Sequence, residues 1–226
     1  MKHLLMICLW VALIFSGVLS GGGCKTKDEA ADPVVKTGVA PQPDAEVAII
    51  ENADAAYGKI VVELYPNLAP QMVARFKELA KSGFYNGVAW HRINAASGVI
   101  QTGDPNSKND DPDDDGRGDS PLPNVPAELS DIPFERGILG AARRGAGPRL
   151  SEREAYDTAN CQFYISLKRN VAWDKQYTVF GKVIEGLSNA DILAGAPTDT
   201  RYRERPAEKI IIKSITFAPH SDYAVR

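Results

Sequence analysis

The chain reads Phe84-Tyr85-Asn86-Gly87-Val88-Ala89-Trp90-His91-Arg92-Ile93 at the point where a helical pattern gives way to strands. Before this stretch, Pro70 suits the first turn of a helix whose apolar positions recur on one face, and Gly83 suits its end. Val88–Ile93 and Val99–Thr102 have the composition of short strands. We therefore expect Arg92 and Gln101 to lie on two successive strands.

Short apolar segments recur along the rest of the chain. The other predicted strands are Val47–Ile50, Lys59–Tyr65, Gly137–Ala142, Gln162–Leu167, Thr178–Val183 and Lys209–Phe217. A second helix is expected to begin at a capping box of Ser188 and Asp191, flanked by a staple of Leu187 and Ile192. About eight strands and two helices without βαβ alternation predict a mainly β domain. A closed barrel is the favoured form, since closure removes exposed strand edges, and the helices would plug its ends.

The first 23 residues have the pattern of an export signal. Lys2 is followed by an apolar run and then by small residues, which is typical of a secretory signal peptide. The apolar run is about 12 residues long, and a bilayer needs about 20, so a retained transmembrane anchor is the weaker alternative. Residues 24–44 are polar and rich in Ala, Pro and Asp, which predicts a flexible tether. The folded domain is expected over residues 45–218, with a tail at 219–226.

Cys24 makes this prediction more specific. Gly21, Gly22 and Gly23 lead directly into it, and the run resembles the lipobox of bacterial lipoproteins. The resemblance implies lipidation of Cys24 and a location outside the cytoplasm, on the periplasmic side of a membrane or on the cell surface. Lys25, rather than Asp, follows the cysteine and favours the outer membrane. Simple secretion remains open, because the usual Leu three positions before the cysteine is Gly21 here.

Composition excludes several classes of function. The net charge is −3, and no cluster of Lys and Arg interleaved with aromatics indicates nucleic-acid binding. Cys161 is the lone cysteine of the predicted domain, so the domain can form no internal disulfide. No Cys/His cluster has the spacing of a zinc site. A monomer is the default expectation.

Four motifs occur in order. The opening stretch leads to Val99-Ile100-Gln101-Thr102-Gly103-Asp104-Pro105, then to Thr158-Ala159-Asn160-Cys161-Gln162-Phe163-Tyr164-Ile165, then to Tyr177-Thr178-Val179-Phe180-Gly181-Lys182-Val183. Together they resemble the cyclophilin family of peptidyl-prolyl cis-trans isomerases over roughly residues 45–217. The resemblance implies an eight-stranded antiparallel barrel capped by two α-helices. It also implies an enzyme (EC 5.2.1.8) that assists folding by rotating X-Pro bonds.

The reaction explains why an arginine is needed. The bond before proline has a rotation barrier of about 18–20 kcal/mol. In the twisted transition state the prolyl nitrogen becomes pyramidal, and a fixed donor aimed at it stabilises that state selectively. Arginine is always charged and presents a rigid fork of donors. By resemblance Arg92 is this donor, Gln101 holds it and bonds the substrate backbone, and His91 helps shape the site or is simply packed. No metal or cofactor is required.

The resemblance also implies a pocket for the proline ring. Its expected lining residues are Val99, Ala142, Arg143, Tyr164, Trp173 and Tyr177. Phe163 and Phe180 are expected in the core instead. Family members usually carry a pocket Phe within the segment that here reads 94–98, so that aromatic is missing or comes from elsewhere, with Trp173 as the candidate. Arg143 replaces the usual Asn. These departures leave open a proline-peptide-binding chaperone module with weak or lost catalysis.

Two loops are longer than in the family. Residues 104–131 contain Asp111-x-Asp113-x-Asp115-Gly116, which matches half of a calcium loop but has Leu122 where the bidentate Glu belongs. A solvated acidic loop is therefore favoured over a calcium site. Residues 145–156 are flanked and punctuated by arginines, and they are expected to form a plain surface loop or to contact acidic substrates. The expected partners overall are proline-containing peptides, unfolded exported proteins and a membrane.

Overall fold

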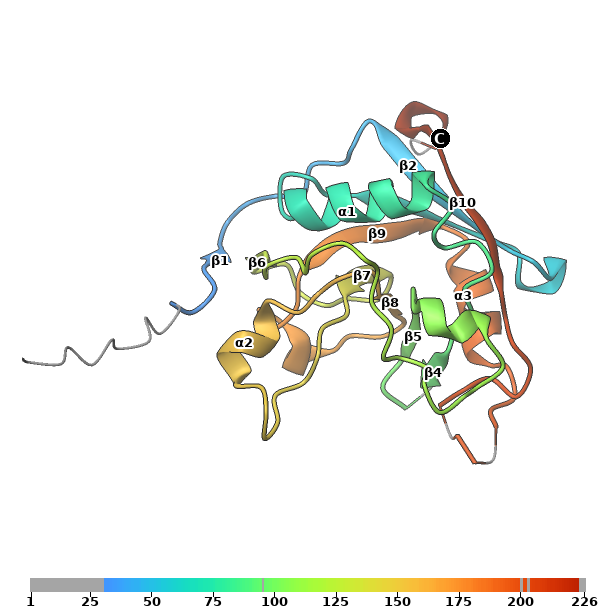
Figure 1. Ribbon diagram of the computed structural model, residues 1–226. Helices are drawn as coiled ribbons and strands as arrows, with labels where there is room; N and C mark the ends of the chain where they lie inside the picture. Colours follow the sequence, from blue (N-terminus) through green and yellow to red (C-terminus); the bar gives the residue numbers. More distant parts are fainter. Residues whose placement is uncertain (1–30, 95, 200, 203, 224–226) are drawn as a thin grey trace, which may run out of the picture. The chain divides into compact units, whose positions relative to one another are not determined.

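Eight strands of the computed structural model form one antiparallel sheet (Figure 1). Their order across the sheet is β10–β2–β3–β9–β7–β8–β5–β4. Their bounds are β2 Glu46–Asn52, β3 Lys59–Leu64, β4 Arg92–Asn94, β5 Val99–Thr102, β7 Ile138–Ala141, β8 Phe163–Ser166, β9 Val179–Glu185 and β10 Ile212–Pro219. The structure describes residues 31–94, 96–199, 201–202 and 204–223. The mainly β prediction is confirmed.

The predicted closed barrel needs a correction, because the two outer strands, β4 and β10, do not pair with each other as strands. A single antiparallel bridge joins Ala89 to Ile211 just before them. Trp90 N donates to Ile210 O at 2.9 Å, but Ile93 N donates to Glu204 O. Between these two hydrogen bonds lie two residues on one side, 91 and 92, and five on the other, 205–209. The longer side contains Pro206, which has no N–H for a ladder. The extra chain interrupts the pairing, so the sheet stays open in its strand order.

The described residues contain three α-helices rather than two: α1 Pro70–Lys81, α2 Glu152–Tyr156 and α3 Leu187–Ala194. Figure 1 shows α1 lying along the sheet above β9, while α3 contacts β3, β4 and β5. The predicted helix after Pro70 is confirmed, and its buried face consists of Met72, Val73, Phe76, Leu79 and Ala80. The short α2 was missed, because it lies inside the loop at residues 145–156.

The predicted capping box at Ser188 is wrong. The residue that caps α3 is Gly186, which has a left-handed conformation with φ +79° and no side-chain cap. A Cβ on Gly186 would lie 2.1 Å from Lys59 O, so close approach of the backbones requires glycine there. Asp191 instead pairs with Arg136, and Ile192 is half exposed rather than a staple. A capping box does occur, at Ser151 and Glu154 of α2.

The N-terminus of α1 is capped from a distance. Its N-cap residue, Ala69, has no side-chain acceptor. The carboxylate of Glu128 accepts from Gln71 N at 3.1 Å and from Met72 N at 2.9 Å. A carboxylate at this end also complements the helix dipole. Glu128 therefore ties the long loop before β7 to the start of α1.

Aromatic rings fill the centre of the sheet. Phe76, Phe163 and Phe180 are fully buried, and Phe76 packs edge-on against Phe163 with ring centroids 5.3 Å apart. The prediction that Phe163 and Phe180 belong to the core is confirmed. A second buried cluster comprises Tyr65, Leu68, Val99, Phe134, Ile138, Tyr164 and Val179. This second cluster forms the base of the pocket described below.

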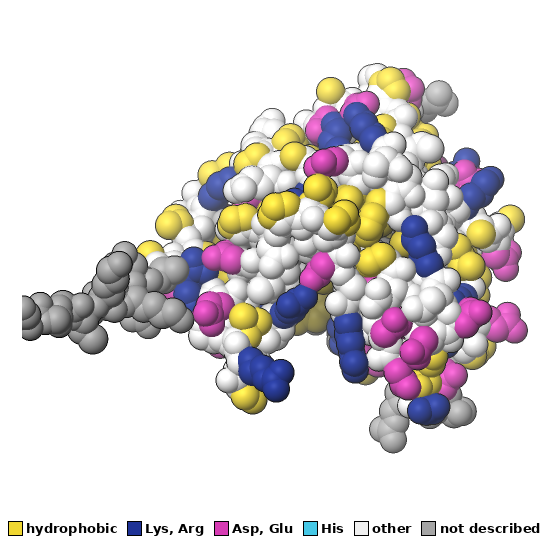
Figure 2. Space-filling model, in the orientation of Figure 1, with side chains coloured by type: hydrophobic (Ala, Val, Ile, Leu, Met, Phe, Trp, Pro, Cys, Tyr) yellow, Lys and Arg dark blue, Asp and Glu magenta, His cyan; other side chains and the backbone are white. Residues whose placement is uncertain are grey.

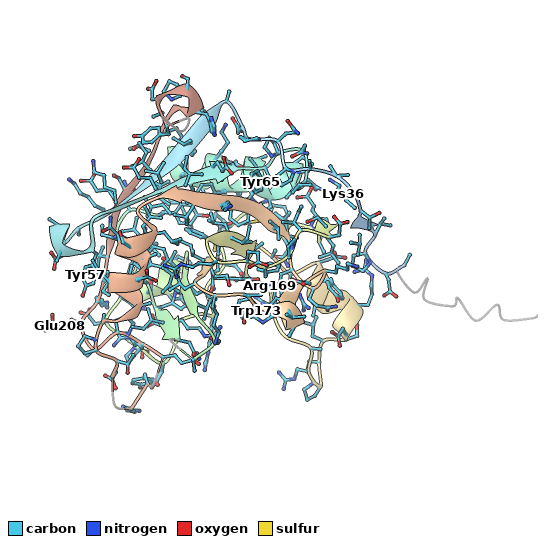
Figure 3. All side chains as sticks on the ribbon, turned by 180° about the vertical axis from the view of Figure 1, so that it is seen from behind. Lys36, Tyr57, Tyr65, Arg169, Trp173 and Glu208 are labelled. Carbon is cyan, nitrogen blue, oxygen red and sulfur yellow. The ribbon has the colours of Figure 1, made fainter. Side chains whose placement is uncertain are left out.

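Part of the segment predicted to be a tether packs on the domain. Short strand β1, Val35–Lys36, pairs in parallel with β6, Leu129–Ser130. Lys36, labelled in Figure 3, donates through Nζ to Leu68 O at 2.6 Å. At the other end, His220 N donates to Ala45 O, so the predicted tail also begins on the domain surface. The signal peptide and Cys24 lie outside the described residues.

The helices of the described ranges are all too short or too polar to cross a membrane.

Candidate active site

Eight of the residues singled out from the sequence line one pocket, called here the aromatic pocket. They are Arg92, Val99, Gln101, Ala142, Arg143, Tyr164, Trp173 and Tyr177. The pocket is open to the surface, and its empty volume is about 360 Å³. The expected convergence of Arg92, Gln101, Tyr164 and Trp173 on one groove is thus found, and their individual roles stay predictions.

Strand register brings these side chains together. Arg92 of β4 pairs with Gln101 of β5, and Gln101 pairs in turn with Tyr164 of β8. Directly opposed residues of antiparallel strands point to the same face of the sheet. The three side chains therefore form a row across three strands, although they come from segments up to 72 residues apart.

A chain of hydrogen bonds runs along this row. Arg92 Nη1 donates to Gln101 Oε1 at 3.3 Å, and Gln101 Nε2 donates to Gln162 Oε1 at 3.0 Å. Gln162 Nε2 then donates to Gly118 O at 2.9 Å. Gln101 is therefore oriented at both ends, with its acceptor oxygen facing Arg92. Gln162 was not singled out from the sequence, although it stands two residues before Tyr164.

A second residue that was missed, Glu204, holds Arg92 from the opposite side. Its carboxylate accepts from Arg92 Nε at 2.5 Å and also from the side-chain amide of Asn94. Burial alone would raise the pKa of Glu204, but the hydrogen bond and the charge of Arg92 outweigh it, so this pKa lies below its usual value. Glu204 is 112 residues from Arg92 in a loop without periodicity, and no sequence pattern indicated it.

Tyr164 forms the floor of the aromatic pocket. It is 5% exposed, stacks on Phe134, and meets Trp173 and Tyr177 edge-on at 5.2 and 5.8 Å between ring centroids. Its hydroxyl has no hydrogen-bond partner among the described residues, and burial raises its pKa well above the usual value. Gly140 lies opposite Tyr164 in the sheet, and a Cβ there would stand 2.3 Å from the tyrosine ring. Glycine at 140 thus makes room for the ring.

Trp173 supplies an aromatic wall where the segment at 94–98 has none. It ends the 3-10 turn Val171–Trp173, and its side chain, labelled in Figure 3, lines the aromatic pocket. Phe134 packs against both Trp173 and Tyr177 with centroids 6.0 and 6.3 Å apart. Phe134 was missed, because it stands alone in an irregular loop. Its burial suggests support of the wall rather than contact with a ligand.

His91 does not line the aromatic pocket. It is 7% exposed, and neither ring nitrogen makes a hydrogen bond to a described residue. Burial, opposed by the charge of Asp115, lowers its pKa to about 4, so the ring is neutral at pH 7. It lines a neighbouring pocket, called here the histidine pocket, together with Arg92, Gln101 and Glu204. His91 thus lies next to the aromatic pocket without lining it, and whether it shapes the site or is simply packed stays a prediction.

Three carboxylates of the acidic loop bond to residues far along the chain. Asp115 pairs with Arg205 at 2.9 Å, and Asp110 pairs with Lys209 at 3.0 Å. Asp113 accepts from Tyr202 Oη at 2.6 Å. Within the described ranges there is no group of three His, Cys, Asp or Glu residues that could hold a metal ion. The loop is thus tied to the segment that carries Glu204.

Comparisons with known proteins agree with this geometry. The family described as "Cyclophilin type peptidyl-prolyl cis-trans isomerase/CLD" matches residues 47–217. A "Probable peptidyl-prolyl cis-trans isomerase" of Brucella suis biovar 1 is 37% identical over 186 residues, covering 80% of this chain and 87% of the relative. "Peptidyl-prolyl cis-trans isomerase-like 3" of Dictyostelium discoideum is 32% identical over 165 residues, covering 70% and 89%.

The fold is similar to solved structures as well. A crystal structure of a Cryptosporidium parvum cyclophilin-type peptidyl-prolyl cis-trans isomerase superposes with a TM-score of 0.64 at 26% identity. That match covers 76% of this chain and 97% of the other. A second structure of the same protein, obtained in the presence of the dipeptide Ala-Pro, superposes with a TM-score of 0.62.

Proposed function

The chain belongs to the cyclophilin-type peptidyl-prolyl cis-trans isomerases, and from this premise we propose that it rotates X-Pro bonds in exported proteins while tethered to a membrane. The isomerase activity is that of the family. The residues that perform it, the class of client and the tether are the proposal. The observation that carries the assignment of residues is the position of Arg92 at the edge of the aromatic pocket, braced on two sides.

The aromatic pocket binds the proline ring. Tyr164 and Trp173 offer flat apolar surfaces at its floor and wall, and Val99 is buried beneath them. A pyrrolidine ring fits such a surface because burial of its apolar area is favourable. Binding of the ring holds the proline in place, so the rotation moves the residue that precedes the proline.

Arg92 lowers the barrier to that rotation. Its Nε is engaged by Glu204 and its Nη1 by Gln101, and within the described part of the chain no hydrogen bond occupies Nη2. A donor held in this way can address the prolyl nitrogen, whose lone pair becomes available only when the bond is twisted and amide resonance is lost. The interaction is stronger in the twisted state than in either planar state, which is the condition for catalysis. No covalent intermediate forms, so no nucleophile is needed.

Gln101 and the rim complete the arrangement. Gln162 orients the amide of Gln101, whose Nε2 and Oε1 lie beside the pocket that would hold the substrate backbone. Ala142 and Arg143, directly after β7, form the rim on the far side. A peptide lying between these two edges would keep the X-Pro bond over Arg92.

Work outside the cytoplasm is supported by the N-terminal sequence. The apolar run after Lys2 and the small residues before Cys24 have the pattern of a lipoprotein signal. The segment from Val35 onward packs beside β6, which leaves about ten residues between Cys24 and the domain. Such a short tether would hold the enzyme within a few nanometres of the membrane surface.

The proposal about clients and anchoring is tested in one experiment. The full chain and a Cys24→Ser variant are produced in a bacterium that processes lipoproteins, and membrane and soluble fractions are compared. We expect the full chain in the membrane fraction and the variant in the soluble one, with both accelerating refolding of an exported protein limited by X-Pro isomerisation. Equal distribution of the two proteins would refute the lipid anchor. Normal turnover of X-Pro peptides without acceleration of refolding would refute the client class.

A further inference from the structure

We propose that this isomerase prefers substrates with an acidic side chain next to the proline, and that Arg143 selects them by binding the carboxylate of that side chain. The inference rests on the proposed function, because it concerns the peptide bound at the same site. It goes further in naming a substrate class and the residue that selects it.

Arg143 stands where three pockets meet. It lines the aromatic pocket and the histidine pocket. It also lines a third pocket, called here the polar pocket, whose other lining residues are Gln101, Gly116, Arg117, Asp119, Ala142, Arg144, Thr158, Asn160 and Gln162. Gln101 is common to all three pockets as well. A peptide whose proline occupies the aromatic pocket and whose neighbouring residues enter either adjoining pocket would therefore lie beside Arg143.

The guanidinium of Arg143 is held in place by neutral groups. Its carbon lies 4.4 Å from the ring centroid of Tyr156 and 4.8 Å from that of Tyr177. Nε donates to Gln176 O at 3.3 Å, and Nη1 donates to Arg144 O at 3.2 Å. Tyr156 is itself fixed, since its hydroxyl donates to Gln176 Oε1 at 2.5 Å. The charge is thus pre-positioned by aromatic faces and backbone oxygens, and the ordering cost of binding is reduced.

No carboxylate balances that charge in the part of the chain that the structure describes. The other arginines around the three pockets are mostly paired: Arg92 with Glu204, Arg144 with Asp119 and Arg205 with Asp115. Arg143 makes no such ion pair, and Nη2 of its guanidinium is not used by a described residue. The rim of the aromatic pocket therefore carries uncompensated positive charge.

The chemistry of the matching ligand follows from this arrangement. A guanidinium fork complements the two oxygens of a carboxylate, and the interaction is strengthened where the partner is partly desolvated. A lysine or arginine of the substrate would meet like charge at the same place, so the rim also works against basic neighbours of the proline. The space-filling view shows Lys and Arg side chains on both sides of a hollow in the lower part of the molecule (Figure 2).

The test compares peptides that share one X-Pro bond and differ in charge beside it. Glu, Gln or Lys is placed directly before the proline in one series and directly after it in another. The quantity measured is the ratio of kcat/KM for the Glu peptide to that for the Lys peptide. We expect a ratio of about fivefold in at least one series, since a partly exposed ion pair gives a modest preference. The ratio should shrink in concentrated salt.

Two variants assign the preference to Arg143. In Arg143→Gln the Glu-to-Lys ratio should fall to about one, and in Arg143→Lys, which keeps the charge but not the fork, it should be intermediate. Arg149→Gln is the control, because Arg149 is an exposed arginine of the same loop and lines none of the three pockets. It should keep the wild-type ratio. Circular dichroism checks that each variant is folded.

The outcomes separate the two proposals. If the wild-type protein turns over Glu, Gln and Lys peptides equally, the inference about Arg143 is overturned and the isomerase assignment stands. The same conclusion follows if the preference is unchanged in Arg143→Gln. If no peptide is turned over, the proposed function itself fails.

Discussion

At the scale of single residues, the position of Arg92, the proposed catalytic residue, is set by the side chains that bond to it. A free arginine side chain loses about 2 kcal/mol of rotamer entropy when it is fixed. Here Glu204 and Gln101 fix two of the three guanidinium nitrogens of Arg92 before substrate binds. Part of the rotamer entropy of Arg92 is thus lost when the protein folds, so less is lost when the substrate reaches the transition state.

Glu204 is predicted to be a positioning residue. Glu204→Gln should lower kcat/KM by about two- to fivefold at pH 7, because the pair is about 40% exposed and such pairs are weak. The decrease should lie mainly in kcat, since the interaction of Arg92 with the twisted bond is the one that loosens. Glu208→Gln, a change on the exposed surface of the same loop (Figure 3), is the matched control. An unchanged kcat in Glu204→Gln would contradict this role.

His91 is predicted to make stability depend on pH. Its pKa is 6.5 when unfolded and about 4 when folded, so between these values the unfolded chain binds more protons. Stability from the neutral ring is therefore complete above pH 6.5 and is lost as pH falls toward 4. The loss amounts to about 3 kcal/mol, at 1.36 kcal/mol per pKa unit.

Urea unfolding of the wild type and of His91→Gln, measured from pH 4 to pH 7, checks this prediction. The difference in the free energy of unfolding between the two proteins should shrink as pH falls, because glutamine does not titrate. Carboxylates titrate in both proteins and cancel in the difference. A constant difference across the range would show that the pKa of His91 is the same in the folded and the unfolded chain, which would contradict this prediction.

At the scale of elements, loops rather than helices supply the contacts that fix Arg92. Asp104 follows β5, and its buried carboxylate accepts from Asn106 N, Arg117 N and Gly118 N at 2.8, 3.0 and 3.1 Å. This organises the acidic loop, whose Asp115 then pairs with Arg205 next to Glu204. The brace on Arg92 is thus connected to β5 through two loops.

The remote cap of α1 gives a prediction at this scale. Glu128→Ala should lower the free energy of unfolding by about 1–2 kcal/mol, because two backbone donors at the helix start lose their acceptor. Glu128→Gln should lose less, since one amide oxygen can still accept. Glu78→Ala on the exposed face of α1 is the control and should change stability little. Equal stability of all three variants in urea would rule out the cap.

Sequence patterns predicted elements well where they depend on local periodicity. The helix after Pro70 and the strands around Lys59–Tyr65 and Gln162–Leu167 lie where expected, since each has a continuous apolar pattern. The start of α3 was mispredicted, because the contact of Gly186 with Lys59 O comes from strands distant in sequence. Helix α2 was missed since its five residues carry too little periodicity.

At the scale of the whole molecule, the sequence likewise predicted the parts of the site that belong to local patterns and missed those set by contacts between distant segments. The resemblance predicted every residue that lines the aromatic pocket, because each lies in a family motif or at a position aligned with the family's pocket. It did not single out Glu204, Gln162 or Phe134, which contact pocket residues and do not line the aromatic pocket themselves. The prediction of a closed barrel was only partly right, because the extra residues around Pro206 interrupt the pairing between the segments that contain β4 and β10.

The gap between the outer strands lies next to the candidate site. The residues that interrupt the pairing form the loop that carries Glu204 and Arg205 to the site. A fully paired edge would place ladder hydrogen bonds where the brace on Arg92 now stands. The departure from a regular barrel therefore lies beside Arg92 rather than at a remote edge.

The role of Arg92 is tested most directly by kcat/KM on an X-Pro peptide for wild type, Arg92→Lys, Arg92→Ala and the control Arg149→Ala. A preorganised charged donor in a transition state contributes about a hundredfold or more. We predict a loss of at least that size in Arg92→Ala, an intermediate loss in Arg92→Lys, wild-type rates in the control and nearly unchanged peptide binding throughout. Equal rates for Arg92→Ala and the wild type would contradict the central claim.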